Sequence, residues 1–194
     1  MRKRWQMVGA VMLVLCGAGS LHAQDTQDAA RRAGFWISFG LGGGVNTASV
    51  STNENRGGVA GYVRAGGAPS GHVVLGSEFI GWATEANDVT TSRGNATLFV
   101  QYYPSTTGGL FFKGGLGGAG IAVSRSITSG TLVNDAQGFG LTLGGGYEFR
   151  LSRIASFATN LDWVFQAFDD PLPGNADTSS LFLLTIGITF PRIQ

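Results

Sequence analysis

Apolar residues recur at every second position along eight separate stretches of the chain. Near the C-terminus, for example, Phe182, Leu184 and Ile186 share one face of an extended chain, because successive side chains of a strand point to opposite sides. Strict alternation over this length predicts strands with two unlike faces. The stretches with this pattern are 35–45, 57–65, 72–82, 95–103, 110–123, 138–151, 155–168 and 179–190.

The connections between these stretches alternate between short and long. In a chain of antiparallel strands, successive connections fall at opposite ends, so all the short turns share one end and all the long loops share the other. The sequence therefore predicts an all-β fold, an eight-stranded antiparallel up-and-down barrel with both termini at the short-turn end. The short turns are 65–72, 104–109 and 152–155, and the long polar loops are 46–57, 84–93, 124–137 and 169–180.

Composition indicates which solvent surrounds the barrel. Only 13% of the residues are charged, against about 25% in ordinary soluble domains. The mature chain has no run of roughly 18 apolar residues, which excludes a helical membrane protein. A closed barrel is the remaining way to satisfy backbone N–H and C=O groups in lipid. We therefore expect a transmembrane β-barrel with lipid against its apolar face; a soluble lipocalin-like barrel with the same residues as its core is the alternative.

The N-terminus has the pattern of a secretory signal peptide. Three basic residues, Arg2, Lys3 and Arg4, precede a short apolar run, and small residues lead to an expected cleavage site after Ala23. The apolar run is too short to span a bilayer as a helix. The expected organisation is a cleaved signal peptide over 1–23, a short periplasmic segment over 24–34 and an outer-membrane barrel over 35–194.

Cleavage changes the charge and the cysteine count. Lys+Arg falls from 13 to 10 against 12 acidic residues, so the mature net charge is −2. This argues against nucleic acid as a partner, because phosphate binding needs a concentrated basic surface. The only cysteine, Cys16, leaves as well, and with it any disulfide or thiol chemistry. A lipid-anchored Cys16 is the weaker alternative, because Leu15 before it is bulky where lipoprotein signals have a small residue.

The chain resembles the OmpA-like and opacity-porin-like eight-stranded outer-membrane barrels. The resemblance covers residues 35–190 and rests on the alternating strands, above all GFWISFGLGGGV, LFFKGGLGGAG, GFGLTLGGGYEFRLS and the last strand. It implies location in the cell outer membrane, with outer-membrane lipids and the barrel-assembly machinery as partners. The closing strand is similar to the signal that this machinery reads, which implies that role for Thr185, Gly187 and Phe190.

Six charged residues fall on the polar, inward face of the strands. An eight-stranded barrel is only wide enough for side chains to fill it, so we expect ion pairing. Strand heights predict a Lys113–Glu148 pair with Arg150 close by. They leave Glu78 and Asp162 at mid-height without a basic residue clearly level, and a contact of Arg64 with one of them stays open. An internal network that fills the barrel is favoured over an ion path. The predicted lumen charge network is Arg64, Glu78, Lys113, Glu148, Arg150 and Asp162.

The mature chain offers little for catalysis. Its one histidine, His72, lies by a short turn, and a Ser–His–carboxylate arrangement at the opposite rim is unavailable. We expect no catalytic residue, no cofactor and no metal site; the acidic residues of the last loop are interpreted as solvated. The hypothesis is a non-enzymatic outer-membrane barrel with a structural or surface-interaction role, in which four extracellular loops contact any ligand or surface. A narrow pore or small-molecule transit barrel is the alternative, and a lipid-modifying enzyme is a third.

Overall fold

The computed structural model describes residues 34–48, 56–86, 89–127, 130–152, 154–169 and 177–191. The expected signal peptide and almost all of the expected periplasmic segment lie outside the described residues. Within them, no helix is long and apolar enough to cross a membrane. The strands are β1 (Gly34–Ala48), β2 (Arg56–Ala68), β3 (Val73–Ala86), β4 (Val89–Tyr102), β5 (Leu110–Ile127), β6 (Gly130–Arg150), β7 (Ser156–Phe168) and β8 (Thr178–Pro191).

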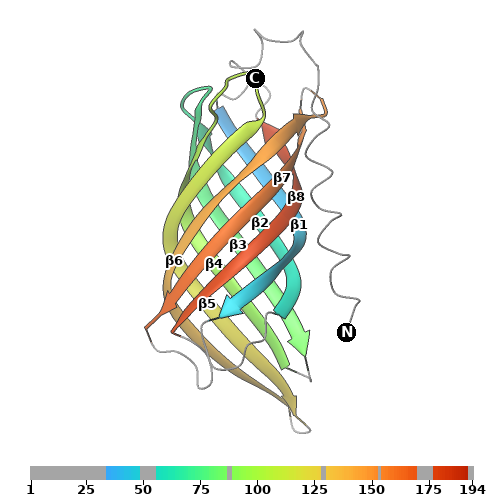
Figure 1. Ribbon diagram of the computed structural model, residues 1–194, viewed down its shortest axis with the longest axis vertical. Helices are drawn as coiled ribbons and strands as arrows, with labels where there is room; N and C mark the ends of the chain where they lie inside the picture. The colour runs from blue at the N-terminus through green and yellow to red at the C-terminus, as the bar shows by residue number, and fades with distance from the viewer. Residues whose placement is uncertain are drawn as a thin grey trace, which may run out of the picture.

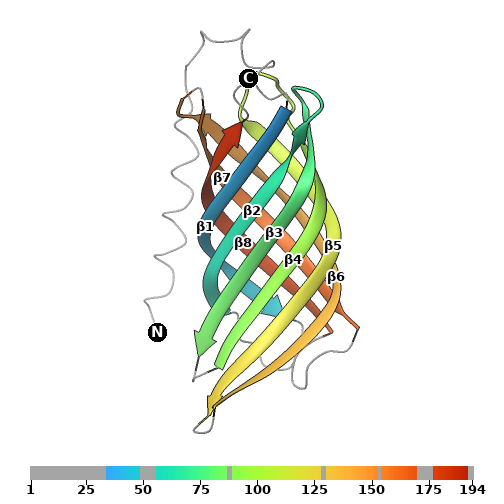
Figure 2. The same cartoon turned by 180° about the vertical axis from the view of Figure 1, so that it is seen from behind.

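The strands form one closed, tilted barrel (Figures 1 and 2). Each strand pairs antiparallel with its neighbour in sequence, and β8 returns to pair with β1, where Leu41 lies opposite Ile186. This closure removes both edges of the sheet, so that no row of backbone N–H and C=O groups is left unpaired along the wall. The predicted eight-stranded antiparallel up-and-down barrel is confirmed.

The two faces of the wall differ as the alternation predicts. Leu41, Val59 and Leu98 point outward and are 70%, 68% and 73% exposed. In β8, by contrast, Leu183 and Thr185 point inward and are fully buried. Aromatic side chains are exposed toward both ends of the wall. They are Phe35, Tyr102, Tyr147, Phe149 and Phe190 at the short-turn end, and Phe139 and Phe182 toward the other.

Two of the four predicted long loops are wrong. Strand β3 continues to Ala86, which pairs with Val89 at the start of β4. Likewise β5 continues to Ile127, which pairs with Gly130 of β6. Both predicted loops, 84–93 and 124–137, are therefore mostly strand. Polar residues such as Thr90, Ser92 and Ser124 interrupt the hydrophobic alternation in these segments, so the period of two that indicates a strand is lost there.

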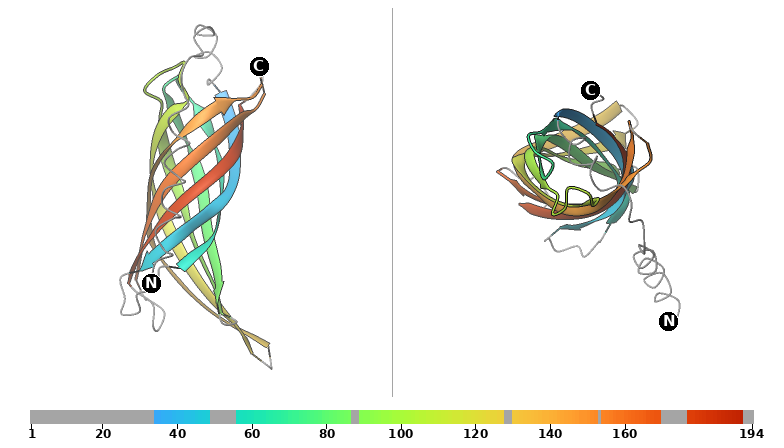
Figure 3. Two further views of the ribbon diagram at one scale, coloured as in Figure 1. Left: turned by 45° about the vertical axis from the view of Figure 1, so that its right-hand side comes forward. Right: turned by 90° about the horizontal axis from the view of Figure 1, so that it is seen from above.

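The β5–β6 hairpin extends past the rest of the wall (Figures 1 and 3). Pairing of β6 with β7 begins only at Gly138 and Phe168, whereas β6 pairs with β5 from Gly130 onward. Residues 130–137 therefore have a strand neighbour on one side only. The molecule has a short-turn end, with both ends of the barrel sequence, and a hairpin end.

Side chains fill the barrel interior in layers. An apolar cluster lies at the short-turn end, a polar zone occupies the middle, and apolar clusters lie toward the hairpin end. The first cluster is Trp36, Ala68, Val74, Phe99, Tyr103 and Phe111. The clusters toward the hairpin end are Ala60, Tyr62, Ile80, Trp82, Val164, Leu181 and Leu183, and then Ala119, Ile121, Ala136 and Phe168.

Candidate functional site in the barrel lumen

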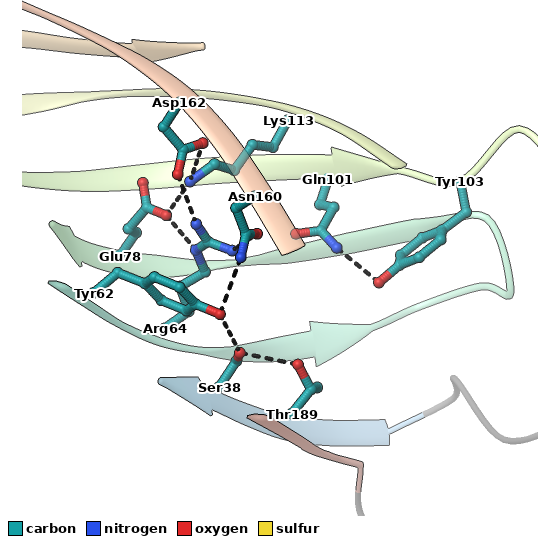
Figure 4. A network of polar contacts seen from close by, with 10 residues as sticks. All are labelled: Ser38, Tyr62, Arg64, Glu78, Gln101, Tyr103, Lys113, Asn160, Asp162 and Thr189. Carbon is teal, nitrogen blue, oxygen red and sulfur yellow. Dashed lines mark hydrogen bonds and ion pairs between the residues drawn. The ribbon is translucent and has the colours of Figure 1, made fainter. Parts of the chain in front are cut away.

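Four charged side chains meet in the polar zone: Arg64, Glu78, Lys113 and Asp162, the lumen ion cluster. Arg64 Nε and Lys113 Nζ both donate to Glu78 Oε2. Arg64 Nη2 lies 3.2 Å from Asp162 Oδ2, and Lys113 Nζ lies 3.1 Å from Asp162 Oδ1. All four side chains are 2% exposed or less. Two cations thus alternate with two anions, and the cluster is neutral as a whole (Figure 4).

Strand register brings these residues to one level. Arg64 lies directly opposite Glu78 across β2 and β3. Lys113 and Asp162 both lie opposite Gly144, one from the β5 side and one from the β7 side. A Cβ atom at Gly144 would collide with Asp162 Oδ1. The missing side chain at Gly144 therefore provides the space across which the ammonium and the carboxylate approach each other.

Neutral polar groups hold the Arg64 guanidinium in place. Nη1 donates to Asn160 Oδ1 at 2.8 Å, and the guanidinium carbon lies 3.8 Å from the centre of the Tyr62 ring. Asn160 Nδ2 donates in turn to Tyr62 Oη at 3.3 Å. Ser38 Oγ lies 3.3 Å from the same phenol oxygen and accepts a hydrogen bond from Thr189 Oγ1 at 2.9 Å. A polar network therefore extends from the ion cluster to β1 and β8 (Figure 4).

The expected Lys113–Glu148 pair is wrong. Lys113 lies opposite Gly144, four positions before Glu148 on β6, and pairs with Glu78 and Asp162 instead. Glu148 Oε2 accepts a hydrogen bond from Tyr103 Oη at 2.7 Å. The physical reason is the stagger between neighbouring strands. Residues that are the same number of positions from the short-turn end lie at different heights in the barrel.

The other residues expected in the lumen have different outcomes. Glu78 and Asp162 had no clearly level basic residue in the sequence, and Arg64 was expected to reach one of them at most; in the structure Arg64 contacts both. Arg150, expected in the lumen, is exposed at the end of β6. The predicted network therefore separates into a buried cluster of four charges and two residues nearer the short-turn end, Glu148 and Arg150.

Several lumen residues were not predicted from the sequence. Tyr62 and Asn160 were placed on strands but given no role, although both contact Arg64. Arg93 was assigned to a loop, but it lies on β4 with its side chain inside the barrel and is 4% exposed. The signal for Arg93 was present, since it continues the inward series Asn95, Thr97 and Phe99 toward the hairpin end.

The three residues of the expected assembly signal lie as follows. Thr185 is fully buried and lies opposite Gly42 and Asn160. Gly187 also faces inward, and a Cβ there would collide with Tyr62 Oη. Phe190 faces outward and stacks on Phe39 with ring centres 5.9 Å apart. Recognition of these residues by the assembly machinery stays a prediction.

His72 has a structural environment at the short-turn end. Its Nδ1 lies 2.8 Å from the Tyr103 carbonyl oxygen, and its ring stacks on Tyr102 at 6.2 Å. Among the described residues, no group of three or more His, Cys, Asp or Glu side chains is arranged to hold a metal ion. The chemistry that the lumen carries is thus charge pairing and hydrogen bonding across the barrel.

A closed eight-stranded antiparallel barrel with an apolar exterior and a polar network inside has the OmpA-like, Ail-like fold of small outer-membrane barrels. Among solved structures, the chain is similar to Neisserial surface protein A, with a TM-score of 0.60, 11% sequence identity and coverage of 82% of this chain and 98% of that one. It is also similar to Ail, the attachment invasion locus protein of Yersinia pestis, with a TM-score of 0.58, 11% identity and coverage of 82% and 99%. No family model and no curated protein matches the chain. These likenesses establish the fold.

Proposed function

We propose that the protein is a non-enzymatic β-barrel of the bacterial outer membrane, with a structural or surface-interaction role exerted from its hairpin end. The belt of exposed apolar side chains around the whole wall carries this proposal. A soluble monomer rarely exposes contiguous apolar patches larger than a few hundred Å², whereas lipid is the natural solvent for such a belt. Aromatic side chains toward both ends of the belt fit the two membrane interfaces.

The filled interior supports a structural role over a pore. The cluster that includes Trp36, Phe99 and Phe111 occupies the short-turn end, and the one that includes Ile80, Trp82 and Leu183 lies beyond the ion cluster. A hydrated ion would have to displace both apolar layers and separate the paired charges between them. A steady unitary conductance of the purified protein in planar bilayers would favour the narrow pore instead.

The hairpin end is proposed to face outward, because outer-membrane barrels have their longer connections outside the cell. The exposed charged side chains described at this end are mostly acidic: Glu85, Asp135, Asp169 and Asp177, with Arg125 as the basic one. Ail has been solved in complex with the heparin analogue sucrose octasulfate, at a TM-score of 0.53 and 14% identity to this chain. A polyanion of that kind would be repelled here, so we infer a neutral or basic partner surface.

Two measurements test the proposal. Membrane fractionation followed by gels of boiled and unboiled samples should place a heat-modifiable barrel in the outer membrane. An epitope inserted at 128–129 should be labelled on intact cells, whereas one inserted at 106–107 should need permeabilised cells. Purified protein that stays monodisperse without detergent would refute the membrane location. Labelling of the 106–107 tag alone on intact cells would refute the orientation.

A further inference from the structure

Arg93 is a second buried guanidinium in the lumen, and its surroundings differ from those of Arg64. Arg64 contacts two carboxylates and an amide oxygen. Arg93 is 4% exposed, and its Nε and Nη1 are buried without a hydrogen-bond partner among the described residues. Burying a charged group without a partner is costly, so this side chain is unlike the other buried ions of the lumen.

Apolar groups surround Arg93. Its strand neighbours are Trp82 on β3 and Ile121 on β5. The centre of the Phe168 ring lies 5.7 Å from its guanidinium carbon, and Ile121 and Phe168 belong to one apolar cluster with Ala119 and Ala136. Attraction to the face of one ring offsets part of the solvation that the buried guanidinium has lost. The N–H donors of the guanidinium are still available to an acceptor.

Asn95 and Gln166 form a polar pair on neighbouring inward positions, and the donors of this pair are already engaged. Gln166 Nε2 donates to Asn95 Oδ1 at 2.8 Å and to the Gly94 carbonyl oxygen at 3.2 Å. Asn95 Nδ2 donates to the Phe165 carbonyl oxygen at 3.4 Å. Gln166 Oε1 is itself buried without a hydrogen-bond partner among the described residues, so this pair does not satisfy the Arg93 donors, and a neutral amide would leave the charge of the guanidinium uncompensated. The ion cluster is paired within itself on the far side of the apolar cluster that includes Trp82 and Leu183.

We propose that Arg93 is the anchor of a binding site for a small organic carboxylate that has an apolar body, at the hairpin end of the lumen. The guanidinium fork matches a carboxylate in bidentate geometry. The apolar side chains around it suit a hydrocarbon or aromatic body: Trp82, Ile121 and Phe168. They offer no polar contacts that could replace the water around an inorganic anion. This site is separate from the surface-interaction role, because binding in detergent does not depend on what the protein contacts outside the cell.

The test is isothermal titration of the mature protein in an uncharged detergent with hexanoate, which is short enough to stay out of micelles. We expect saturable binding to the wild type, at least tenfold weaker binding to Arg93→Met, and an intermediate affinity for Arg93→Lys. The matched control is Arg125→Met, which removes an exposed arginine of the same end and should bind hexanoate as the wild type does. Heat-modifiability gels establish that each variant is a folded barrel.

Three other ligands separate the chemical sources of binding. Hexanol keeps the apolar body without the charge, and acetate and inorganic phosphate keep the charge without the body. Each should bind at least tenfold more weakly than hexanoate. Hexanoate binding that is unchanged in folded Arg93→Met would overturn the proposal, and so would acetate or phosphate binding as tight as that of hexanoate, which would mark a simple anion site.

Discussion

Replacement of Lys113 by Met removes one of the two cations of the lumen ion cluster while keeping most of the side-chain volume. Glu78 and Asp162 would then share Arg64 alone. The Lys113 side chain is 1% exposed in the wild type, so water cannot easily replace the lost ammonium. Two unit charges at the 3.1 Å that separates Lys113 Nζ from Asp162 Oδ1 interact by about 5 kcal/mol at an effective dielectric constant of about 20. Loss of one partner of a buried pair costs about 3–5 kcal/mol, so we expect a loss of that size in the free energy of unfolding.

The assay is reversible urea unfolding in phospholipid vesicles, followed by tryptophan fluorescence and by gel mobility without boiling. Asp162→Asn completes a double-mutant cycle, since Lys113→Met with Asp162→Asn leaves the Arg64–Glu78 pair neutral. The double variant should lose at least about 1 kcal/mol less than the sum of the two single variants, because neighbouring charges are coupled. The control is Arg125→Met, an exposed site where the change should stay within about 0.5 kcal/mol. A Lys113→Met loss below about 1 kcal/mol, or additive single effects, would refute the cluster as a stabilising unit.

The remaining predictions use the same unfolding assay. Leu98→Arg places a charge on the outward face at a side chain that is 73% exposed; it should cost about 2–4 kcal/mol in lipid, and a neutral effect would contradict a lipid-facing wall. Gly144→Ala should cost about 1–3 kcal/mol because the added Cβ collides with the carboxylate beside it, whereas Gly118→Ala, with only one atom at 4.0 Å, should be nearly neutral; equal effects would contradict the space argument. Arg93→Met should raise the stability of the ligand-free barrel, whereas Arg64→Met should lower it by about 3–5 kcal/mol; a loss at both positions would show that Arg93 is paired.

The strands and their faces could be predicted because the outward face of the wall is apolar along most of each strand, whereas the inward face mixes polar and apolar residues. Leu184 and Thr185, for example, differ in exposure as their positions in the alternation require. The hairpin extensions could not be predicted in this way. Residues such as Thr90 and Ser124 pair with each other across β4 and β5, but in this part of the two strands neither face is apolar enough to leave a period of two.

The sequence predicted which side chains point into the lumen, but it did not predict which of them contact each other. Direction depends only on whether a position is odd or even, while the choice of partner depends on stagger between strands. Lys113 was therefore placed inside correctly and paired with the wrong residue. The role of Gly144 was also hidden, because a glycine gives no sequence signal of the side chain that occupies its space.

The lumen ion cluster joins residues that are between 14 and 98 positions apart in the chain. Its contacts between β2 and β7 can form only after the wall has curved enough to bring these strands face to face. Interactions that appear this late in folding mainly slow the escape from the native state rather than speed its formation. The cluster should therefore slow unfolding: a barrel without it would fold at a similar rate and unfold faster.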